Sequence, residues 1–511
     1  MNILLFHKKR LTLSFWLILS VFVVNAQKQY NQDLVESGEF INPIFSGDYP
    51  DPSILVDGDD FYMVHSSFDY YPGLTIWHSK DLINWNPIAN PLTKNVGSVW
   101  APDLVKYDDK FYIYLPVNST NYVIVADDIS GPWSDPIDLK IGRIDPGHVA
   151  DDDGNRYLYF NDGGYVPLSK DGLSVIGDFK PSYDGWEIPR DWTIECFCLE
   201  GPKFFKRGDY YYITVAEGGT AGPATGHMVI SARSKSPLGP WENSPYNPII
   251  RAESQQDKWW SVGHATIIEA KPNDWWMVFH GYEKDHYNMG RQTLLAPVEW
   301  TDDGWFKLPN DFDLEKPLNK PNLPEFKSDY RLSDNFEGNS LHPKWKFFKN
   351  YDANRFQVKN NSLTIKAKGN SIPESSPLLI IPAHHSYSAQ VEIELKDGAV
   401  GGLVMFYNEK GSSGVLADKN NIIANLRGWQ FVTEKNVINR RVFLKIENNN
   451  HIVDMYYSLD GKTWQKIESS LEVSGYHHNV LSGFLSLRIG LVAIGEGEVT
   501  FKNFKYKAIK K

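Results

Sequence analysis

Cysteine is almost absent from this sequence, which has only two among its 511 residues, Cys196 and Cys198. So small a number excludes a scaffold held together by disulfides, and the stability of the fold must come from packing. The two cysteines stand at positions i and i+2 of an apparent strand, so their side chains share one face. Because a disulfide across a single intervening residue would be strained, we expect two small buried thiols.

Long apolar runs are absent after residue 26, and no later segment is long enough to span a membrane. At the N-terminus, basic residues at 8–10 precede an apolar run over 11–24, and a small-residue cleavage motif ends at Ala26. This order is typical of a secretory signal peptide, so residues 1–26 predict export to the periplasm or the medium.

Positive charge is also scarce, with 52 Lys and Arg against 63 Asp and Glu. The net charge of −11 becomes about −14 once the basic residues of the signal peptide are removed. Nucleic acids and anionic membranes bind basic surfaces, so neither is expected as a partner. An acidic surface suits a neutral substrate.

The region from about residue 40 to residue 310 repeats one pattern five times. Each copy is a short apolar strand, a turn rich in Asp, Gly and Asn, and a strand of aromatic and β-branched residues, which is typical of a β-hairpin. No stretch between the copies is helical enough to form βαβ units. The repeats predict an all-β fold in which residues 27–316 form a five-bladed β-propeller.

The C-terminal part of the chain has a different texture. Prolines punctuate residues 317–329, which we interpret as a linker. From residue 330 to residue 511 apolar and polar residues alternate, as at 390–395 and 442–447. Alternation over many strands gives each strand one buried and one wet face. We therefore expect a second domain at 330–511 that is a β-sandwich of the jelly-roll kind.

Three carboxylates fall at nearly one point of the repeat. Aligned on their strands, the five copies place at equivalent positions Asp51, Ala101, Asp145, Glu200 and His264. The innermost strands of a propeller line its channel, so these side chains converge on the axis, whereas Asp103 is displaced and structural. A turn role would explain the Asp-Pro pairs but not Glu200. Carboxylates held together raise one another's pKa, which is an arrangement typical of active sites.

A buried pair of carboxylates is what glycoside hydrolysis requires. One is protonated and gives its proton to the leaving oxygen, while the other is ionised and acts as base or nucleophile. A third carboxylate nearby can keep the acid protonated and orient it. These residues therefore predict a glycosidase.

The motifs around these positions resemble the successive signatures of glycoside hydrolase family 43. They are Tyr-Pro-Asp-Pro-Ser at 49–53, the stretch from Ser-Ser-Phe at 66–68 to Pro-Gly-Leu at 72–74, Trp-Ala-Pro-Asp at 100–103, Ile-Asp-Pro at 144–146, Leu-Glu-Gly-Pro at 199–202, Gly-His at 263–264 and Gly-Arg-Gln-Thr at 290–293. The resemblance extends in order over about residues 40–310. The second domain is similar to the concanavalin-like sandwich that often follows this propeller.

Carried over residue by residue, the resemblance implies an inverting hydrolase. Asp51 would be the general base that activates water, and Glu200 would be the general acid. Asp145 would tune the pKa of Glu200 and orient it. Arg291 would contact the substrate or Asp145, and inversion implies that base and acid stand far enough apart to admit a water.

His264 corresponds to an axial histidine that in some family members belongs to a hydrated calcium site. Calcium prefers six to eight oxygen ligands, so waters would have to supply most of the shell. The resemblance therefore requires no cofactor and allows a structural, water-mediated calcium at His264. The alternative is a histidine that only forms hydrogen bonds within the channel.

The sequence is rich in aromatic residues, which stack on sugar rings but also fill β cores. Trp100, beside Ala101, and Phe68, in the loop after the first hairpin, are the candidate sugar platforms, and Trp77 is a weaker candidate. In each case the alternative is a side chain of the core.

The resemblance implies release of terminal pentose units from plant hemicellulose or its oligosaccharides, of the arabinoxylan, arabinan or xyloglucan type. Insertions at 172–190 and 220–226 favour a closed pocket and exo action. We favour an α-L-arabinofuranosidase over a β-D-xylosidase. An endo-arabinanase and a non-catalytic carbohydrate-binding propeller are the further alternatives, whereas a retaining, fructan-cleaving propeller would open with an Asn-Asp-Pro-Asn-Gly motif that is absent.

For the second domain, a structural lid that contributes a loop to the pocket is favoured over a carbohydrate-binding module.

Overall fold

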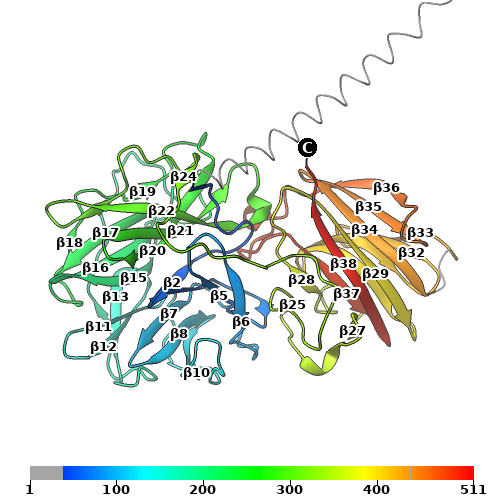
Figure 1. Ribbon diagram of the computed structural model, residues 1–511, viewed down its shortest axis with the longest axis horizontal. Helices are drawn as coiled ribbons and strands as arrows, with labels where there is room; N and C mark the ends of the chain where they lie inside the picture. The colour runs from blue at the N-terminus through cyan, green and yellow to red at the C-terminus, as the bar shows by residue number, and fades with distance from the viewer. Residues whose placement is uncertain (1–37, 437–439, 511) are drawn as a thin grey trace, which may run out of the picture.

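The computed structural model describes residues 38–436 and 440–510. It consists of a β-propeller and a β-sandwich that lie side by side (Figure 1). The expected signal peptide lies outside the described residues. Among the residues described, no helix is both long enough and apolar enough to cross a membrane.

Five antiparallel sheets form the blades of the propeller. Blade 1 consists of β2 (Ser53–Asp57), β3 (Asp60–Val64), β5 (Ile76–Ser79) and β6 (Asn86–Ala89). Blade 2 consists of β7 (Asp103–Tyr107), β8 (Lys110–Val117), β9 (Thr120–Ala126) and β10 (Ile137–Asp138). Blade 3 consists of β11 (Gly147–Ala150), β12 (Arg156–Tyr159), β13 (Gly164–Leu168) and β14 (Lys180–Pro181), with the 3-10 helix η1 (Asn161–Gly163).

The last two blades are larger. Blade 4 consists of β15 (Leu199–Arg207), β16 (Tyr210–Glu217), β17 (Met228–Ser234), β18 (Glu242–Asn243) and β19 (Ile250–Arg251). Blade 5 consists of β20 (Trp259–Lys271), β21 (Asp274–Glu283), β22 (Arg291–Trp300) and β23 (Phe306–Lys307), with the 3-10 helix η2 (Tyr287–Met289). The innermost strands β2, β7, β11, β15 and β20 neighbour one another in a ring, so their first residues meet at one end of the axis.

The local sequence explains the hairpins and the closure of the ring. The two residues between β7 and β8, Asp108 and Asp109, both have positive φ, 51° and 59°, as a type I′ hairpin turn requires. At the ends of the propeller, the amide of Asn42 donates to the carbonyl of Leu295 and accepts from its N–H, both at 2.9 Å. This exchange fastens the N-terminal segment to blade 5, and β1 (Glu39–Phe40) pairs with β24 (Leu318–Asn319).

The sandwich has two antiparallel sheets. The first runs in the order β33 (Trp429–Glu434), β32 (Ile422–Leu426), β31 (Gly411–Ala417), β30 (Val400–Asn408), β37 (Arg488–Ile494), β28 (Leu378–Ile380), β25 (Lys346–Phe348) and β4 (Tyr70–Tyr71). The second runs in the order β26 (Phe356–Val358), β27 (Leu363–Lys366), β38 (Glu498–Ala508), β29 (Ser386–Lys396), β34 (Arg441–Asn449), β35 (Ile452–Ser458) and β36 (Gln465–Glu472). The short helices η3 (Ala353–Arg355) and α2 (His478–Leu481) lie in connecting loops.

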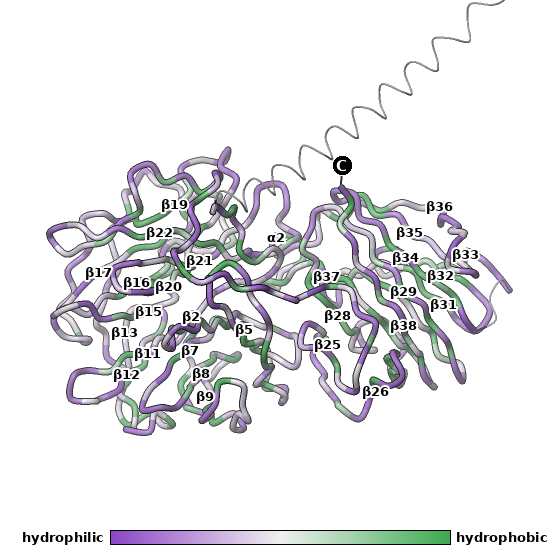
Figure 2. The backbone as a smooth tube through the Cα atoms, viewed as in Figure 1, coloured by the Kyte–Doolittle hydropathy of each residue, from purple (hydrophilic) through white to green (hydrophobic). Residues whose placement is uncertain are grey.

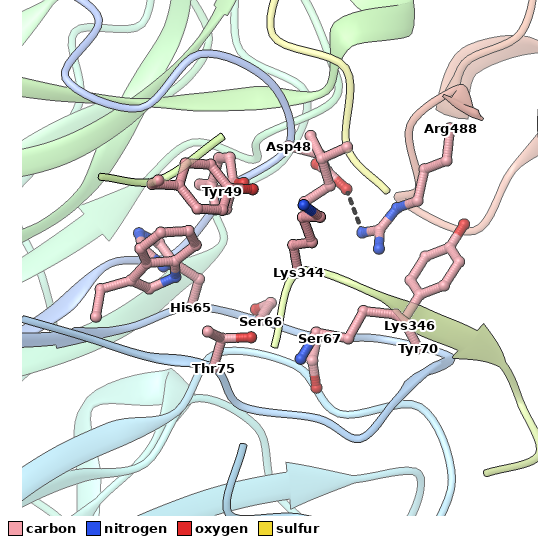
Figure 3. A pocket seen from close by; sticks show the side chains of 13 residues that line it. Asp48, Tyr49, His65, Ser66, Ser67, Tyr70, Thr75, Lys344, Lys346 and Arg488 are labelled. Atoms are coloured by element: carbon pink, nitrogen blue, oxygen red, sulfur yellow. Dashed lines mark hydrogen bonds and ion pairs between the residues drawn. The ribbon is translucent and has the colours of Figure 1, made fainter. Parts of the chain in front are cut away.

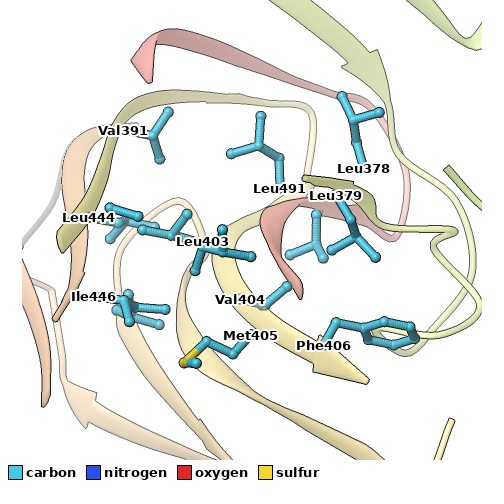
Figure 4. Close-up of a cluster of buried hydrophobic side chains, with 14 of the residues drawn as sticks. Leu378, Leu379, Val391, Leu403, Val404, Met405, Phe406, Leu444, Ile446 and Leu491 are labelled. Atoms are coloured by element: carbon cyan, nitrogen blue, oxygen red, sulfur yellow. The ribbon is translucent and has the colours of Figure 1, made fainter. Parts of the chain in front are cut away.

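Alternating residues build the core between these sheets. Hydrophobic and hydrophilic positions alternate along strands of the second sheet such as β34 and β35 (Figure 2), whereas β30, β31 and β37 of the first sheet are buried almost throughout. The apolar side chains of the facing sheets meet in one buried cluster that includes Leu403, Met405, Leu444, Ile446 and Leu491 (Figure 4). The expected all-β fold, a five-bladed propeller followed by a β-sandwich, is confirmed.

The two domains share a sheet. Strand β4 belongs to the loop between β3 and β5 of blade 1, yet Tyr70 and Tyr71 pair with Phe348 and Phe347 of β25. The first sheet of the sandwich therefore ends in a strand that the propeller supplies. This pairing fixes the sandwich beside the end of the propeller that holds the axial carboxylates.

Candidate active site

One pocket of about 60 Å³ lies at the end of the propeller axis. All seven residues predicted as site residues line it, namely Asp51, Phe68, Trp100, Asp145, Glu200, His264 and Arg291. Residues from every blade contribute to its wall, and Phe484 reaches it from the sandwich. Widely separated segments thus converge as the repeat alignment predicted.

The backbone at the axis corrects one detail of that alignment. Asp51, Asp145 and His264 all have a left-handed backbone, with φ of 56°, 57° and 57°. In blade 4 the residue with this conformation is Gly201, with φ of 62°, and not Glu200. Glu200 therefore stands one residue before the equivalent position. Left-handed backbone at non-glycine residues is strained and concentrates at functional sites.

Asp51 is buried and held ionised by its neighbours. Arg291 donates two hydrogen bonds to its carboxylate, at 2.8 and 3.3 Å, and the Ser66 hydroxyl donates a third at 2.5 Å. Burial opposes ionisation, but the Arg291 guanidinium together with His264 and His280 outweighs it and holds the pKa of Asp51 well below its ordinary value. The expected contact between Arg291 and Asp145 is therefore corrected, since the partner of Arg291 is Asp51. A bidentate Arg–carboxylate pair also fixes the orientation of the carboxylate.

Glu200 and Asp145 form the opposite electrostatic environment. Together with His264 they place one ligand atom each within 4.8 Å of one another. Burial and the negative charge of Asp51 raise the pKa of Glu200 to about 7. Burial and the charge of Glu200 also raise the pKa of Asp145 well above its ordinary value, although Gly201 donates its N–H to Asp145 at 3.1 Å. The pair therefore holds a proton near neutral pH, while Asp51 does not.

His264 lies between these two environments. Its Nδ1 is 3.4 Å from the Asp51 carboxylate, and its Nε2 is buried with no partner among the described residues. Burial lowers the pKa of His264 to about 3, so the ring is neutral and Nε2 or Nδ1 can accept. The nearby oxygens belong to the reactive carboxylates, and six to eight oxygens are not provided by the described side chains. This donor set does not fit a protein-built calcium cage, and a water-built one stays a prediction.

Aromatic side chains form the wall of the pocket. Trp100 and Phe68 both line the pocket, but Trp100 is 38% exposed, whereas Phe68 is only 2% exposed and is largely a core side chain. Phe484 from the sandwich lies 5.4 Å from the Arg291 guanidinium. Trp77 is excluded as a platform, because it is buried among Phe45, Tyr49 and Tyr330.

A second polar ring lies further down the axis. Asp103 pairs with the buried Lys203 at 2.7 Å, and it accepts from the Ser53 hydroxyl and the His148 N–H. Asp103 does not line the active-site pocket. Its predicted structural role is confirmed, because these bonds link the innermost strands of blades 1 to 4.

The two cysteines differ from the expectation. Cys196 and Cys198 are joined by a disulfide, their Cα atoms are 5.3 Å apart, and both are half-buried in the loop before β15. The prediction of two buried thiols on a strand is therefore wrong. The local pattern misled because these residues form a loop and not a strand, and the loop brings their Cα atoms within the ordinary range for a disulfide.

Sequence reasoning missed four residues of the site. Thr220 and Phe484 line the pocket, Ser66 bonds to Asp51, and the His280 Nδ1 accepts from the Asp51 N–H at 3.1 Å. Ser66 lies in a stretch that carried the family resemblance, and Thr220 lies in an insertion that favoured a closed pocket. Phe484 has no local signal, because it lies in a loop of another domain.

Fold and site together define a propeller glycosidase. The family model "Glycosyl hydrolases family 43" matches residues 40–306, and "Beta xylosidase C-terminal Concanavalin A-like domain" matches residues 333–507. The chain belongs to glycosyl hydrolase family 43.

Known relatives carry two activity names. The chain is 34% identical over 363 residues to a "Non-reducing end alpha-L-arabinofuranosidase" of Bacteroides ovatus, with 65% of each chain covered. It is 32% identical over 333 residues to a "Xylan 1,3-beta-xylosidase" of a Vibrio species, with 55% of this chain and 60% of that protein covered. The matches thus span less than two thirds of these relatives.

Among solved structures, the GH43 protein BlXynB from Bacillus licheniformis superimposes with a TM-score of 0.83 at 28% identity. That match covers 92% of this chain and 100% of the other. The two-domain arrangement is therefore shared over nearly the whole chain.

Proposed function

We propose that this protein is an exported, exo-acting, inverting glycosidase that releases terminal pentose units from plant hemicellulose or its oligosaccharides. The observation that carries the proposal is the opposed protonation of Asp51 and Glu200 in one pocket. Arg291 favours the carboxylate form of Asp51, and burial favours the acid form of Glu200. Glycoside hydrolysis needs these two states at the same time.

In the proposed mechanism Asp51 accepts a proton from water as that water attacks the anomeric carbon. Glu200 donates its proton to the glycosidic oxygen, so the leaving sugar departs as an alcohol. Arg291 and Ser66 hold the Asp51 carboxylate in one orientation. Asp145 lies close to Glu200, and we propose that the two coupled carboxyl groups share a proton and that Asp145 orients Glu200 for its transfer.

Exo action is supported by the size and composition of the pocket. The pocket is small, with a volume of about 60 Å³, and Phe484 and Arg291 line one side of it. A polymer bound along its length would need an open cleft. The sandwich loop therefore acts as part of the pocket wall, which favours a lid role for the second domain.

For the sugar we favour α-L-arabinofuranose, with β-D-xylose as the alternative. The similarity to an arabinofuranosidase favours the first, and the similarity to a xylan-cleaving xylosidase favours the second. Export rests on the signal peptide pattern of residues 1–26, and we propose the periplasm or the medium as the destination.

The test is hydrolysis of p-nitrophenyl α-L-arabinofuranoside and β-D-xyloside by the wild type and Glu200→Ala. We expect one glycoside to be cleaved clearly better and the variant to lose at least about 100-fold in kcat. NMR of the first-formed anomer should show inversion. A retained anomer would exclude Asp51 as base, and full activity of Glu200→Ala would exclude Glu200 as acid.

A further inference from the structure

A second cavity lies between the propeller and the sandwich, behind Asp51. Its volume is about 50 Å³, and it shares no lining residue with the active-site pocket. The propeller contributes Asp48, His65 and Ser67, and the sandwich side contributes Lys346 and Arg488 (Figure 3). A water occupies at least about 10–15 Å³ by this measure, so the cavity admits only a few small species.

The positive charges at this cavity outnumber the negative ones. Arg488 pairs with Asp48 at 3.4 Å, and both side chains are buried. Lys346 is 8% exposed and forms no ion pair, its described partner being the side-chain oxygen of Asn90. One ammonium group therefore lacks a counter-ion. Burial, reinforced by Arg488, lowers the pKa of Lys346 well below its ordinary value, which reflects the cost of this missing charge.

Lys344, the neighbouring lysine, provides an internal comparison. It donates to the carbonyls of Arg331 and Ser333 and pairs with Asp334 at 3.2 Å. All three of its N–H donors thus have protein acceptors. Lys346 has protein acceptors for only one, so its remaining donors are free for a ligand.

Further donors around the cavity are unpartnered. The Nε of Arg488 and the hydroxyl of Ser67 are buried and have no partner among the described residues. The His65 Nδ1 is also unpartnered, but it is an acceptor, because the Thr293 hydroxyl donates to the Tyr49 carbonyl and therefore accepts the ring proton of the His65 Nε2. Arg488 is 3% exposed and His65 is 5% exposed. Buried polar groups in folded proteins nearly always have partners. Unpartnered donors from both domains therefore line one cavity next to an unpaired cation.

We propose that this cavity binds one small inorganic anion of halide size, held by Lys346, Arg488 and Ser67. An anion accepts from several donors at once and supplies the missing negative charge, whereas water supplies only the hydrogen bonds. Because its ligands come from the propeller and the sandwich, the anion connects the two domains and stabilises their contact.

The first test is thermal unfolding in sodium chloride against sodium gluconate at constant ionic strength. Chloride should raise the Tm of the wild type in a saturable manner, by roughly 2 °C, since a ligand bound only by the folded state stabilises it. Lys346→Met should lose this response. The matched control is Lys366→Met, at an exposed lysine of the same sandwich, which should respond as the wild type does.

The second test needs no variant and therefore stands if Lys346→Met fails to fold. Crystals of the wild-type protein grown in sodium bromide should show an anomalous peak within hydrogen-bonding distance of the Lys346 Nζ. Equal Tm values in both salts together with no peak in the cavity would overturn the proposal and assign the cavity to water. Neither readout depends on glycosidase activity, so it is independent of the proposed function.

Discussion

Asp51 and Glu200 are carboxyl groups in one pocket whose neighbours give them opposite tasks. The difference is a matter of counter-ions, because Arg291 pairs with Asp51, whereas Glu200 forms no ion pair among the described residues. Two predictions follow from these neighbours.

Between pH 4 and pH 9, kcat/KM should fall on the alkaline side only. The pKa of Glu200 is raised to about 7, and its protonated form is the active one, so activity should be full below that pH and fall as the pH rises through it. The pKa of Asp51 is lowered, so its ionised form persists on the acid side and the rate should stay level down to about pH 4. A rate profile from pH 4 to 9 measures this. A fall centred near pH 5 on the acid side would contradict the assignment of Asp51.

Replacement of the acid should depend on the leaving group. In Glu200→Gln the proton donor is lost while the shape is kept, and we expect kcat on a p-nitrophenyl pentoside to drop by about 10²–10⁴. A dinitrophenyl pentoside, whose leaving group needs no proton, should lose far less. Steady-state rates of both substrates test this, and equal losses would contradict an acid role.

At the scale of the element, the axial residues with left-handed backbone do not all stand at the same place in their strands. Asp51 and Asp145 precede β2 and β11 by two residues, whereas Gly201 and His264 lie inside β15 and β20. The sequence repeats were sufficient to predict the blades, because hairpin turns and strand patterns are local. They were insufficient to choose between Glu200 and Gly201, because the choice depends on backbone φ, which a single sequence does not display. The cysteine prediction failed for a related reason, since it assumed a strand where the chain forms a loop.

Gly201 and Gly208 form a matched pair at the two ends of the first hairpin of blade 4. Both have positive φ, 62° and 58°. A Cβ at residue 201 would lie 2.7 Å from the His264 Nε2, whereas one at residue 208 meets nothing within 4 Å. Both alanine variants should lose about 1 kcal/mol of unfolding free energy to backbone strain. Only Gly201→Ala should also lose activity, by at least about 10-fold, because it displaces His264 and the adjacent Glu200.

Denaturant unfolding and kcat/KM of the two variants separate strain from displacement. Equal activity of Gly201→Ala and Gly208→Ala would contradict this, because it would show that the His264 ring can shift without loss of catalysis.

At the scale of the whole molecule, the pocket is finished by another domain. Phe484 follows even the last axial carboxylate, Glu200, by 284 residues and approaches Arg291 only after the sandwich has docked. No motif marks it, because its position depends on the pairing of β4 with β25. The sequence did predict that a loop of the second domain reaches the pocket, but not which residue does so.

Phe484→Ala should lower kcat/KM on an aryl pentoside by about 10-fold, since the substrate loses a wall that positions it. The fold should persist, because Phe484 lies outside the central core. Phe431→Ala is the matched control, since Phe431 is 51% exposed on β33, the edge strand of the first sheet of the sandwich that lies farthest from β4 in the strand order. Equal kinetics of the two variants would contradict a lid role for the sandwich.

The shared sheet also has a consequence for biosynthesis. The blades of the propeller are complete at about residue 310, but Tyr70 and Tyr71 have no strand partner until the chain near residue 347 has been synthesised. Until then the nascent enzyme presents an unpaired edge of aromatic residues, which is a template for pairing with other chains. Release of the first domain alone, by premature termination or by a cut in the linker, should therefore yield aggregates. The two domains are therefore separate in sequence, but the first needs the second to complete its fold.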